Sequence, residues 1–385
     1  MKSNKYEIIE YLHERLSRKN LDAVFCLGAD NFRYLTGITL PFPKYYPEKQ
    51  FAVFISSGYK VVIVPPEWEQ AVQDQDWGDP ILTYDVNKGN NEFLKILGEI
   101  IKEHKLEVSR IGFDAINTPY NIYQILKSQI STVKLVSIDE DLDESKIIKK
   151  GFEIKLIEKA CEHIDRGIIH ALNHLEGTLD NVGYTIPEYA ERVRVHFYES
   201  GGSGVGDLSV TYGKDTEYLY TTHKGNFKES ELFRTDITAH YLGYWSNLGR
   251  MGFIDEPTKP YENAYNENKL LKKTAIDLLS PGINCNTIYK KISEDANKSG
   301  IKLNSSLIGH GVGVSHVEKP YLNPYDSTEL QTGMVIALDI TTKGPKNEII
   351  HDKDVYEITE KGSRKLSWYR DWDKIYAVTG FRSVH

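Results

Sequence analysis

An acidic residue, Asp339, stands inside one of the most apolar strand-like runs of the chain, "MVIALDITT". An ionised carboxylate in a buried strand costs free energy unless a cation or several hydrogen-bond donors neutralise it. The sequence therefore predicts such a group beside Asp339. At this point a functional and a structural role for the carboxylate are both open.

Four further stretches carry polar side chains where a strand pattern expects apolar ones. They combine imidazoles, carboxylates and amines, the groups that serve acid–base catalysis and metal binding. Taken alone, His223 fits a turn histidine better than a catalytic one. The stretches are "YTTHKG" (His223), "RTDITAHYLGYWSNLGRM" (Asp236, Asn247, Arg250), "GHGVGVSHVEKP" (His310, His316, Glu318) and "IIHDKDVYEITEKG" (His351, Asp352, Lys353, Asp354).

A glycine-rich stretch, "GGSGVGD" at Gly201–Asp207, has the composition of a phosphate-binding loop. Its spacing matches neither the GxGxxG fingerprint nor the P-loop signature. We therefore predict a flexible connection over residues 201–207 and no nucleotide site.

Two kinds of element pattern must position these side chains. Over the first 140 or so residues, helical spacing at 6–20 and in "NEFLKILGEIIKEHKL" alternates with short apolar strands such as "LDAVFCLG" and "YKVVIVPP". This alternation predicts an α/β domain. Farther on, long helices are predicted at 151–175 and 261–279, with strands between and after them. Thr185 is a predicted N-cap of a helix with Pro187 in its first turn.

The bulk composition excludes several classes of protein. The chain has 385 residues, 40% of them hydrophobic, and a net charge of −8, which argues against a nucleic-acid partner. No apolar run approaches the length of a membrane span. The three cysteines, Cys26, Cys161 and Cys285, form no CxxC pair, as expected in a reducing compartment. We therefore expect a cytoplasmic protein that acts on a small molecule, without nucleic acid or membrane.

Taken in order, these stretches resemble the pita-bread superfamily of creatinase, prolidase, aminopeptidase P and methionine aminopeptidase. "LDAVFCLGADNFRYLTG" is similar to their small N-terminal domain, and "KIIKKGFEIKLIEKACEHID" to the helix that opens their catalytic domain. The resemblance covers nearly the whole chain. It implies an α+β protein with a creatinase/prolidase-like α/β domain at 1–142 and a C-terminal pita-bread domain at 143–385.

The metallopeptidases of this superfamily hold two divalent metals with two aspartates, a histidine and two glutamates. The resemblance places Asp236 and His310 at two of these positions, and Asn247, Asp339 and Lys353 at the other three. A neutral amide and an ammonium disfavour a pair of divalent ions. We therefore expect no metal and no cofactor, with Lys353 and a protonated His310 standing where the metals would lie.

Creatinase hydrolyses a C–N bond without metal, and its catalytic histidine matches His223. The resemblance therefore predicts a metal-independent, creatinase-like enzyme acting on a C–N bond of a small amide, amidine or guanidine compound. The reaction is hydrolysis, or cyclisation or elimination in a biosynthetic pathway. On this interpretation the catalytic residues are His223, His310 and Lys353, and the substrate-binding residues are Asp236, Asn247, Arg250, His316, Glu318, Asp339 and Asp352.

Two alternatives remain open. One is a pita-bread protein that binds a partner without catalysis. The other is an X-Pro aminopeptidase or dipeptidase that retains a single metal on Asp236, Asn247, His310 and Asp339. Relatives with the small N-terminal domain are commonly homodimers, so a homodimer is expected, with Arg33 and Tyr34 as candidates to line the partner's site.

Overall fold

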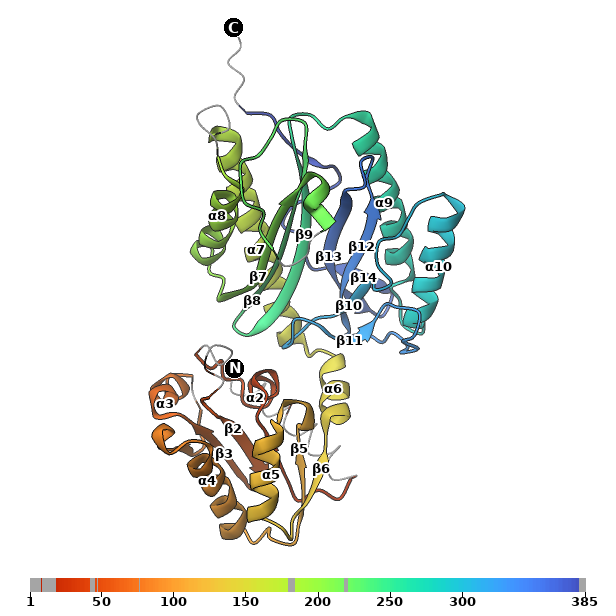
Figure 1. Ribbon diagram of the computed structural model, residues 1–385. Coiled ribbons are helices and arrows are strands. Elements are labelled where there is room, and N and C mark those ends of the chain that lie inside the picture. The colour runs from red at the N-terminus through yellow and green to blue at the C-terminus, as the bar shows by residue number, and fades with distance from the viewer. Residues whose placement is uncertain are drawn as a thin grey trace. The chain divides into compact units, whose positions relative to one another are not determined.

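The computed structural model describes residues 8, 19–41, 46, 48–75, 77–178, 184–217 and 221–380 (Figure 1). Most of the helix predicted at 6–20 lies outside these residues. Contacts divide the chain into two units, Met1–Lys146 and Ile147–His385. The predicted domain boundary between residues 142 and 143 would fall inside α6 (Asp139–Ile147).

In its described part, the first unit is built on a mixed sheet with the strand order β4-β3-β2-β1-β5-β6. β1 pairs in parallel with β5 and antiparallel with β2. Phe25, Phe54 and Phe93 lie in one buried core between the sheet and its helices. The strands are β1 (Ala23–Cys26), β2 (Ala52–Ser56), β3 (Tyr59–Val64), β4 (Ile81–Thr83), β5 (Arg110–Phe113) and β6 (Lys134–Ser137), and the α-helices before α6 are α2 (Ala29–Thr36), α3 (Pro66–Gln73), α4 (Asn90–Glu103) and α5 (Tyr120–Gln129).

The second unit contains a larger, mainly antiparallel sheet. Its described strands follow the order β11-β10-β12-β13-β9-β8-β7, with β14 added to β13 and β15 added to β9. These strands are β7 (Gly204–Tyr212), β8 (Leu232–Tyr241), β9 (Tyr244–Ile254), β10 (Gly309–Gly311), β11 (Glu318–Tyr321), β12 (Val335–Lys343), β13 (Ile349–Thr359), β14 (Gly362–Lys365) and β15 (Tyr376–Val378).

Helices cover one face of this sheet. Figure 1 shows α7 and α8 beside β7–β9, and α9 beside β12 and β13 with α10 next to α9. A second buried core, which includes Ile288, Ile336 and Leu338, joins α9 and α10 to the sheet. The helices are α7 (Gly151–Thr178), α8 (Ile186–Glu199), α9 (Lys259–Leu278) and α10 (Cys285–Lys298). None of the described helices is long and apolar enough to cross a membrane.

The start of α8 confirms a prediction made from the sequence. Thr185 is the N-cap, and its hydroxyl accepts a hydrogen bond from the backbone N–H of Glu188 while the Glu188 carboxylate accepts one from the N–H of Thr185. This reciprocal capping box satisfies two donors that the first turn of a helix leaves unpaired. Pro187 lies in that first turn, where a missing N–H costs nothing.

The glycines of the stretch 201–207 serve close packing on a strand, whereas the sequence predicted a flexible connection. β7 begins at Gly204, so the predicted flexible connection is wrong for its second half. A Cβ atom at Gly204 would lie 2.3 Å from the His240 ring, and one at Gly206 would lie 2.6 Å from the Trp245 ring. Glycine is therefore required because aromatic rings pack directly on this strand.

Candidate functional site

Five strands of the second unit place polar side chains on the sheet face opposite the helices. Side chains alternate between the two faces of a strand, so residues next to helix-facing ones point the other way. On β8, the hydroxyl of Thr235 lies 3.1 Å from that of Tyr189 in α8, so Asp236 faces away from the helices. We call this set the inner-face cluster; its members are Asp236 (β8), Asn247 (β9), His310 (β10), Asp339 (β12), and His351 and Lys353 (β13).

Two groups of β13 bridge the two aspartates of the inner-face cluster. Lys353 Nζ lies 2.9 Å from Asp339 Oδ2 and 3.6 Å from Asp236 Oδ2. His351 Nε2 lies 2.7 Å from Asp339 Oδ1, and its Nδ1 lies 3.8 Å from Asp236 Oδ2. The side chains of Asp236 and Asp339 are 13% and 23% exposed to solvent, so a ligand can reach both carboxylates.

These contacts confirm the prediction that Asp339 needs a cationic neighbour. Burial alone would raise the pKa of Asp339, but His351 and Lys353 hold the pKa of this carboxyl well below its usual range. The carboxylate is therefore ionised at neutral pH.

His351 is a member of the cluster that sequence reasoning left out. It stands in the quoted stretch "IIHDKDVYEITEKG", two residues before Lys353. Because side chains on a strand repeat every second residue, His351 and Lys353 share a face of β13. That alternation was the feature of the sequence that could have found it.

His310 is buried and neutral. Its Nδ1 lies 2.9 Å from the carbonyl oxygen of Gly311, so Nδ1 carries the hydrogen and Nε2 keeps a lone pair. Burial and the Lys353 ammonium lower the pKa of His310 to about 4. The expectation of a protonated His310 in place of a metal is therefore wrong.

Asp352 and Arg250, both predicted to bind substrate, lie on the other face of the sheet. Arg250 Nη2 lies 3.0 Å from Asp165 of α7 and 3.0 Å from Asp354. Asp352 Oδ2 lies 2.8 Å from Lys272 Nζ of α9. All these side chains are buried under the helices. The structure thus separates Asp352 and Arg250 from the inner-face cluster.

Three further candidates also have partners elsewhere. His223 Nδ1 lies 3.2 Å from Asp215 Oδ2, and the His223 ring packs edge-on against Tyr212. The carboxylate of Glu318 lies 2.5 Å from Lys149 Nζ in a buried ion pair. His316 is exposed, with its ring 6.0 Å from that of Trp245. His223 and Glu318 are thus paired outside the inner-face cluster, whereas His316 lies close enough to His310 to help lower the pKa of that imidazole.

The inner-face cluster does not fit the metal pair of the superfamily. Two divalent ions require several anionic oxygens around them. Here an ammonium lies against both aspartates, and Asn247 supplies only a neutral amide. Within the described part of the chain, no three or more His, Cys, Asp or Glu side chains are arranged so that they could hold a metal ion.

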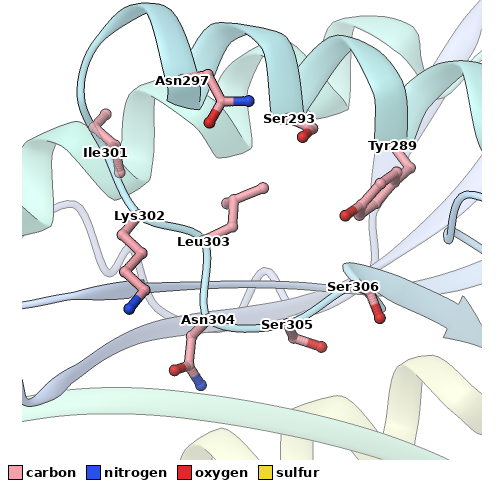
Figure 2. Close-up of a pocket in the computed structure, with 9 residues that line it drawn as sticks. All are labelled: Tyr289, Ser293, Asn297, Ile301, Lys302, Leu303, Asn304, Ser305 and Ser306. Carbon is pink, nitrogen blue, oxygen red and sulfur yellow. The ribbon is translucent and has the colours of Figure 1, made fainter.

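A separate cavity of about 340 Å³ lies between α10 and the segment 301–306 (Figure 2). Figure 2 shows Leu303 pointing into it from the segment, opposite Ser293 and Asn297 of α10. Its lining has hydroxyl and amide groups and the amine of Lys302, but no histidine, cysteine or carboxylate. The inner-face cluster remains the candidate site.

An α/β unit followed by a mainly antiparallel sheet with helices on one face is the architecture of a pita-bread protein. The sequence pattern of metallopeptidase family M24 matches residues 155–364, so the chain belongs to this family. The pattern of the Creatinase/Prolidase N-terminal domain matches residues 9–148. The predicted superfamily and fold class are therefore confirmed. Membership in this peptidase family also places the chain among the hydrolases.

Individual relatives are similar over almost their whole length. The Xaa-Pro dipeptidase of Pyrococcus horikoshii is 26% identical over 367 residues, covering 94% of this chain and 97% of that protein. The X-Pro aminopeptidase of Thermotoga maritima superposes with a TM-score of 0.85 at 16% identity, covering 96% and 99% of the two chains. The prolidase structure of P. horikoshii gives a TM-score of 0.78 at 23% identity, covering 94% and 98%.

These relatives overturn the predicted activity. The prediction was a metal-independent, creatinase-like enzyme acting on a non-peptide C–N bond. The matched proteins are instead Xaa-Pro dipeptidases and prolidases. The alternative drawn from the sequence, an X-Pro aminopeptidase or dipeptidase, agrees with them better.

Proposed function

We propose that the chain is a peptidase of small substrates, which binds a dipeptide of the Xaa-Pro type at the inner-face cluster and hydrolyses its peptide bond. The observation that carries this proposal is the match to Xaa-Pro dipeptidases over 94% of the chain. Such a substrate carries an ammonium and a carboxylate, and a site for it needs groups of both signs.

The cluster offers matching groups for a dipeptide. Asn247 is buried, and its Oδ1 has no hydrogen-bond partner among the described residues, so it can accept a bond from a substrate N–H. The partly exposed carboxylates of Asp236 and Asp339 can bind the substrate ammonium. His310 Nε2 can accept a proton or a hydrogen bond at neutral pH, because its imidazole is neutral there.

Release of free proline from a panel of Xaa-Pro dipeptides tests the proposal, with Xaa-Ala dipeptides for comparison and with Mn²⁺, Co²⁺ or Zn²⁺ added or omitted. We expect cleavage that prefers proline and falls about 100-fold in His310→Ala. His170→Ala is the matched control, since this histidine is exposed on α7, on the helix-covered side of the sheet; the rate of this variant should stay near that of the wild type. Absence of proline release under every condition would rule the proposal out.

One observation favours a second candidate, a dipeptide-binding protein without turnover. Lys353 lies 2.9 Å from Asp339, at a position where the resemblance to the metallopeptidases implies a metal-binding glutamate. Calorimetric titration with the same dipeptides distinguishes the two candidates. Binding that requires Asn247, without release of proline, would support this candidate and exclude the peptidase.

We also propose that the chain is a cytoplasmic homodimer. The support for a dimer is the resemblance to relatives with the same N-terminal domain, and the support for a reducing compartment is three buried cysteines without a disulfide. Tyr34 is not available to a partner subunit, because it is buried and its hydroxyl donates to the carbonyl oxygen of Ser145. Light scattering on the purified chain gives its mass in solution directly; the mass of one chain would exclude the dimer.

A further inference from the structure

The bridging positions of Lys353 and His351 resemble those of two ions between shared carboxylates. Each of the two side chains approaches both Asp236 and Asp339, at distances from 2.7 to 3.8 Å. In a dinuclear centre, metal ions would make these contacts with the carboxylate oxygens. The protein therefore already places nitrogen atoms of its own at the carboxylates where metals would bind.

A glycine on the neighbouring strand creates the room for the His351 ring. Gly249 of β9 pairs with Lys353 of β13. A Cβ atom at position 249 would lie 2.3 Å from Cε1 of His351 and 2.7 Å from its Nδ1. Any other residue at 249 would therefore displace the ring. His351 can therefore occupy this position only because residue 249 is a glycine.

Part of the negative charge of this arrangement is offset without metal. Asp236 and Asp339 carry two negative charges, and the Lys353 ammonium offsets one of them directly. His351 lies between the same carboxylates, with Nε2 2.7 Å from Asp339 Oδ1 and Nδ1 3.8 Å from Asp236 Oδ2. Asn247 adds no charge. A divalent ion would meet an ammonium in direct contact with its ligands, which opposes binding.

We infer that Lys353 and His351, accommodated by Gly249, take the place of the metal pair, so that the inner-face cluster is an ion-paired centre of the protein's own side chains. The inference does not depend on the proposed function, because metal binding is measured without substrate. It concerns what occupies the space between Asp236 and Asp339, whichever dipeptide the chain binds or cleaves.

The test is metal content and affinity. The wild-type chain, purified without chelators and equilibrated with Mn²⁺, Co²⁺ or Zn²⁺, should retain far less than one ion per chain by elemental analysis. Lys353→Met removes the ammonium but keeps the volume, and should raise the affinity for Mn²⁺ about 100-fold in calorimetry. Lys365→Met is the matched control, because Lys365 lies 3.1 Å from Asp354 on the other face of the sheet. This substitution should leave the affinity for Mn²⁺ unchanged.

A combined variant tests the same idea by restoration. Asn247→Asp, Asp339→Glu, Lys353→Glu and His351→Ala together return the carboxylates and clear the space, and we expect this chain to bind divalent ions in stoichiometric amount. Two ions per chain in the wild type would overturn the inference, and this result requires no variant to fold. An unchanged Mn²⁺ affinity in a folded Lys353→Met chain would also overturn it. Proline release, assayed separately, reports only on the proposed function.

Discussion

Gly249 and His351 give the sharpest prediction for single residues. Gly249→Ala places a methyl group 2.3 Å from the His351 ring, so the ring or the strand must move. We expect the free energy of unfolding to fall by about 1–3 kcal/mol, as is usual when a packed site is overfilled. In the double variant with His351→Ala the clash is absent, so the two losses should not add. Urea denaturation of the four chains measures this coupling.

The control uses the same substitution where space is available. Gly177 is an exposed glycine in α7, and a Cβ atom there would meet nothing within 4 Å. Gly177→Ala should therefore stabilise the chain by up to about 1 kcal/mol, because alanine favours a helix over glycine. Equal effects at 177 and 249 would show that contact with His351 is not the cause.

At the scale of single residues, part of the site could be predicted from the sequence. The need of Asp339 for a cation followed from one carboxylate in an apolar strand, and Lys353 and His351 meet that need. The predicted charge of His310 was wrong, because it depends on burial and on the Lys353 ammonium, which act only once the strands are assembled. His223 matched a family position but lies beside Asp215, a local contact that no spacing encodes.

At the scale of elements, β13 separates two groups of charges by alternation. His351 and Lys353 face the inner-face cluster, whereas Asp352 and Asp354 lie under α7 and α9. Arg250 also binds the strand itself, because its Nη1 donates to the backbone carbonyl oxygen of Lys353 at 2.6 Å. Alternation alone places the side chains of Asp352 and Lys353 on opposite faces of the sheet. The sequence does not show which face the helices cover, and the substrate-binding role predicted for Asp352 rests on the resemblance to creatinase.

The buried charges behind β13 predict a large loss on removing one lysine. Lys272 Nζ lies 2.6 Å from Asp354 and 2.8 Å from Asp352, and its side chain is almost fully buried. Lys272→Met leaves two carboxylates undercompensated, so we expect a loss of about 3–5 kcal/mol in the free energy of unfolding. Lys269→Met is the control: its side chain is 25% exposed, and the loss should be about 1 kcal/mol or less. Similar losses for the two variants would contradict this account.

The same charges predict how stability depends on pH. Burial alone would raise the pKa of Asp354, but Lys272, Arg250 and Lys365 hold it well below the ordinary value of 3.8. A depressed carboxyl pKa stabilises the fold above the unfolded pKa, and this contribution is lost as pH falls through the folded one. The stability gap between wild type and Lys272→Met should therefore be largest near pH 6 and narrow below the ordinary pKa. A gap that widens in acid would contradict the ionised state of Asp354.

At the scale of the whole chain, each of the two units has its own hydrophobic core. Phe54 lies in the core of the first unit, and Ile336 lies in that of the second; each side chain is fully buried. The alternation of helices and strands and the long helices of the second half were readable from the sequence because they follow from local periodicity. The sheet that brings five strands to one site depends on pairings between distant segments, such as β9 with β13, which no local pattern reports.

Separate cores predict separate unfolding. Phe54→Ala removes a buried ring from the first unit and should cost that unit about 3–5 kcal/mol, and Ile336→Ala should cost the second unit about 2–5 kcal/mol. Because units with their own cores can unfold independently, calorimetry should show two transitions, and each substitution should lower only one. A dipeptide that binds the inner-face cluster should raise only the transition lowered by Ile336→Ala, since binding stabilises the unit that holds the site. If both substitutions shifted a single common transition, the two units would unfold as one, and a ligand at the cluster would then stabilise the whole chain.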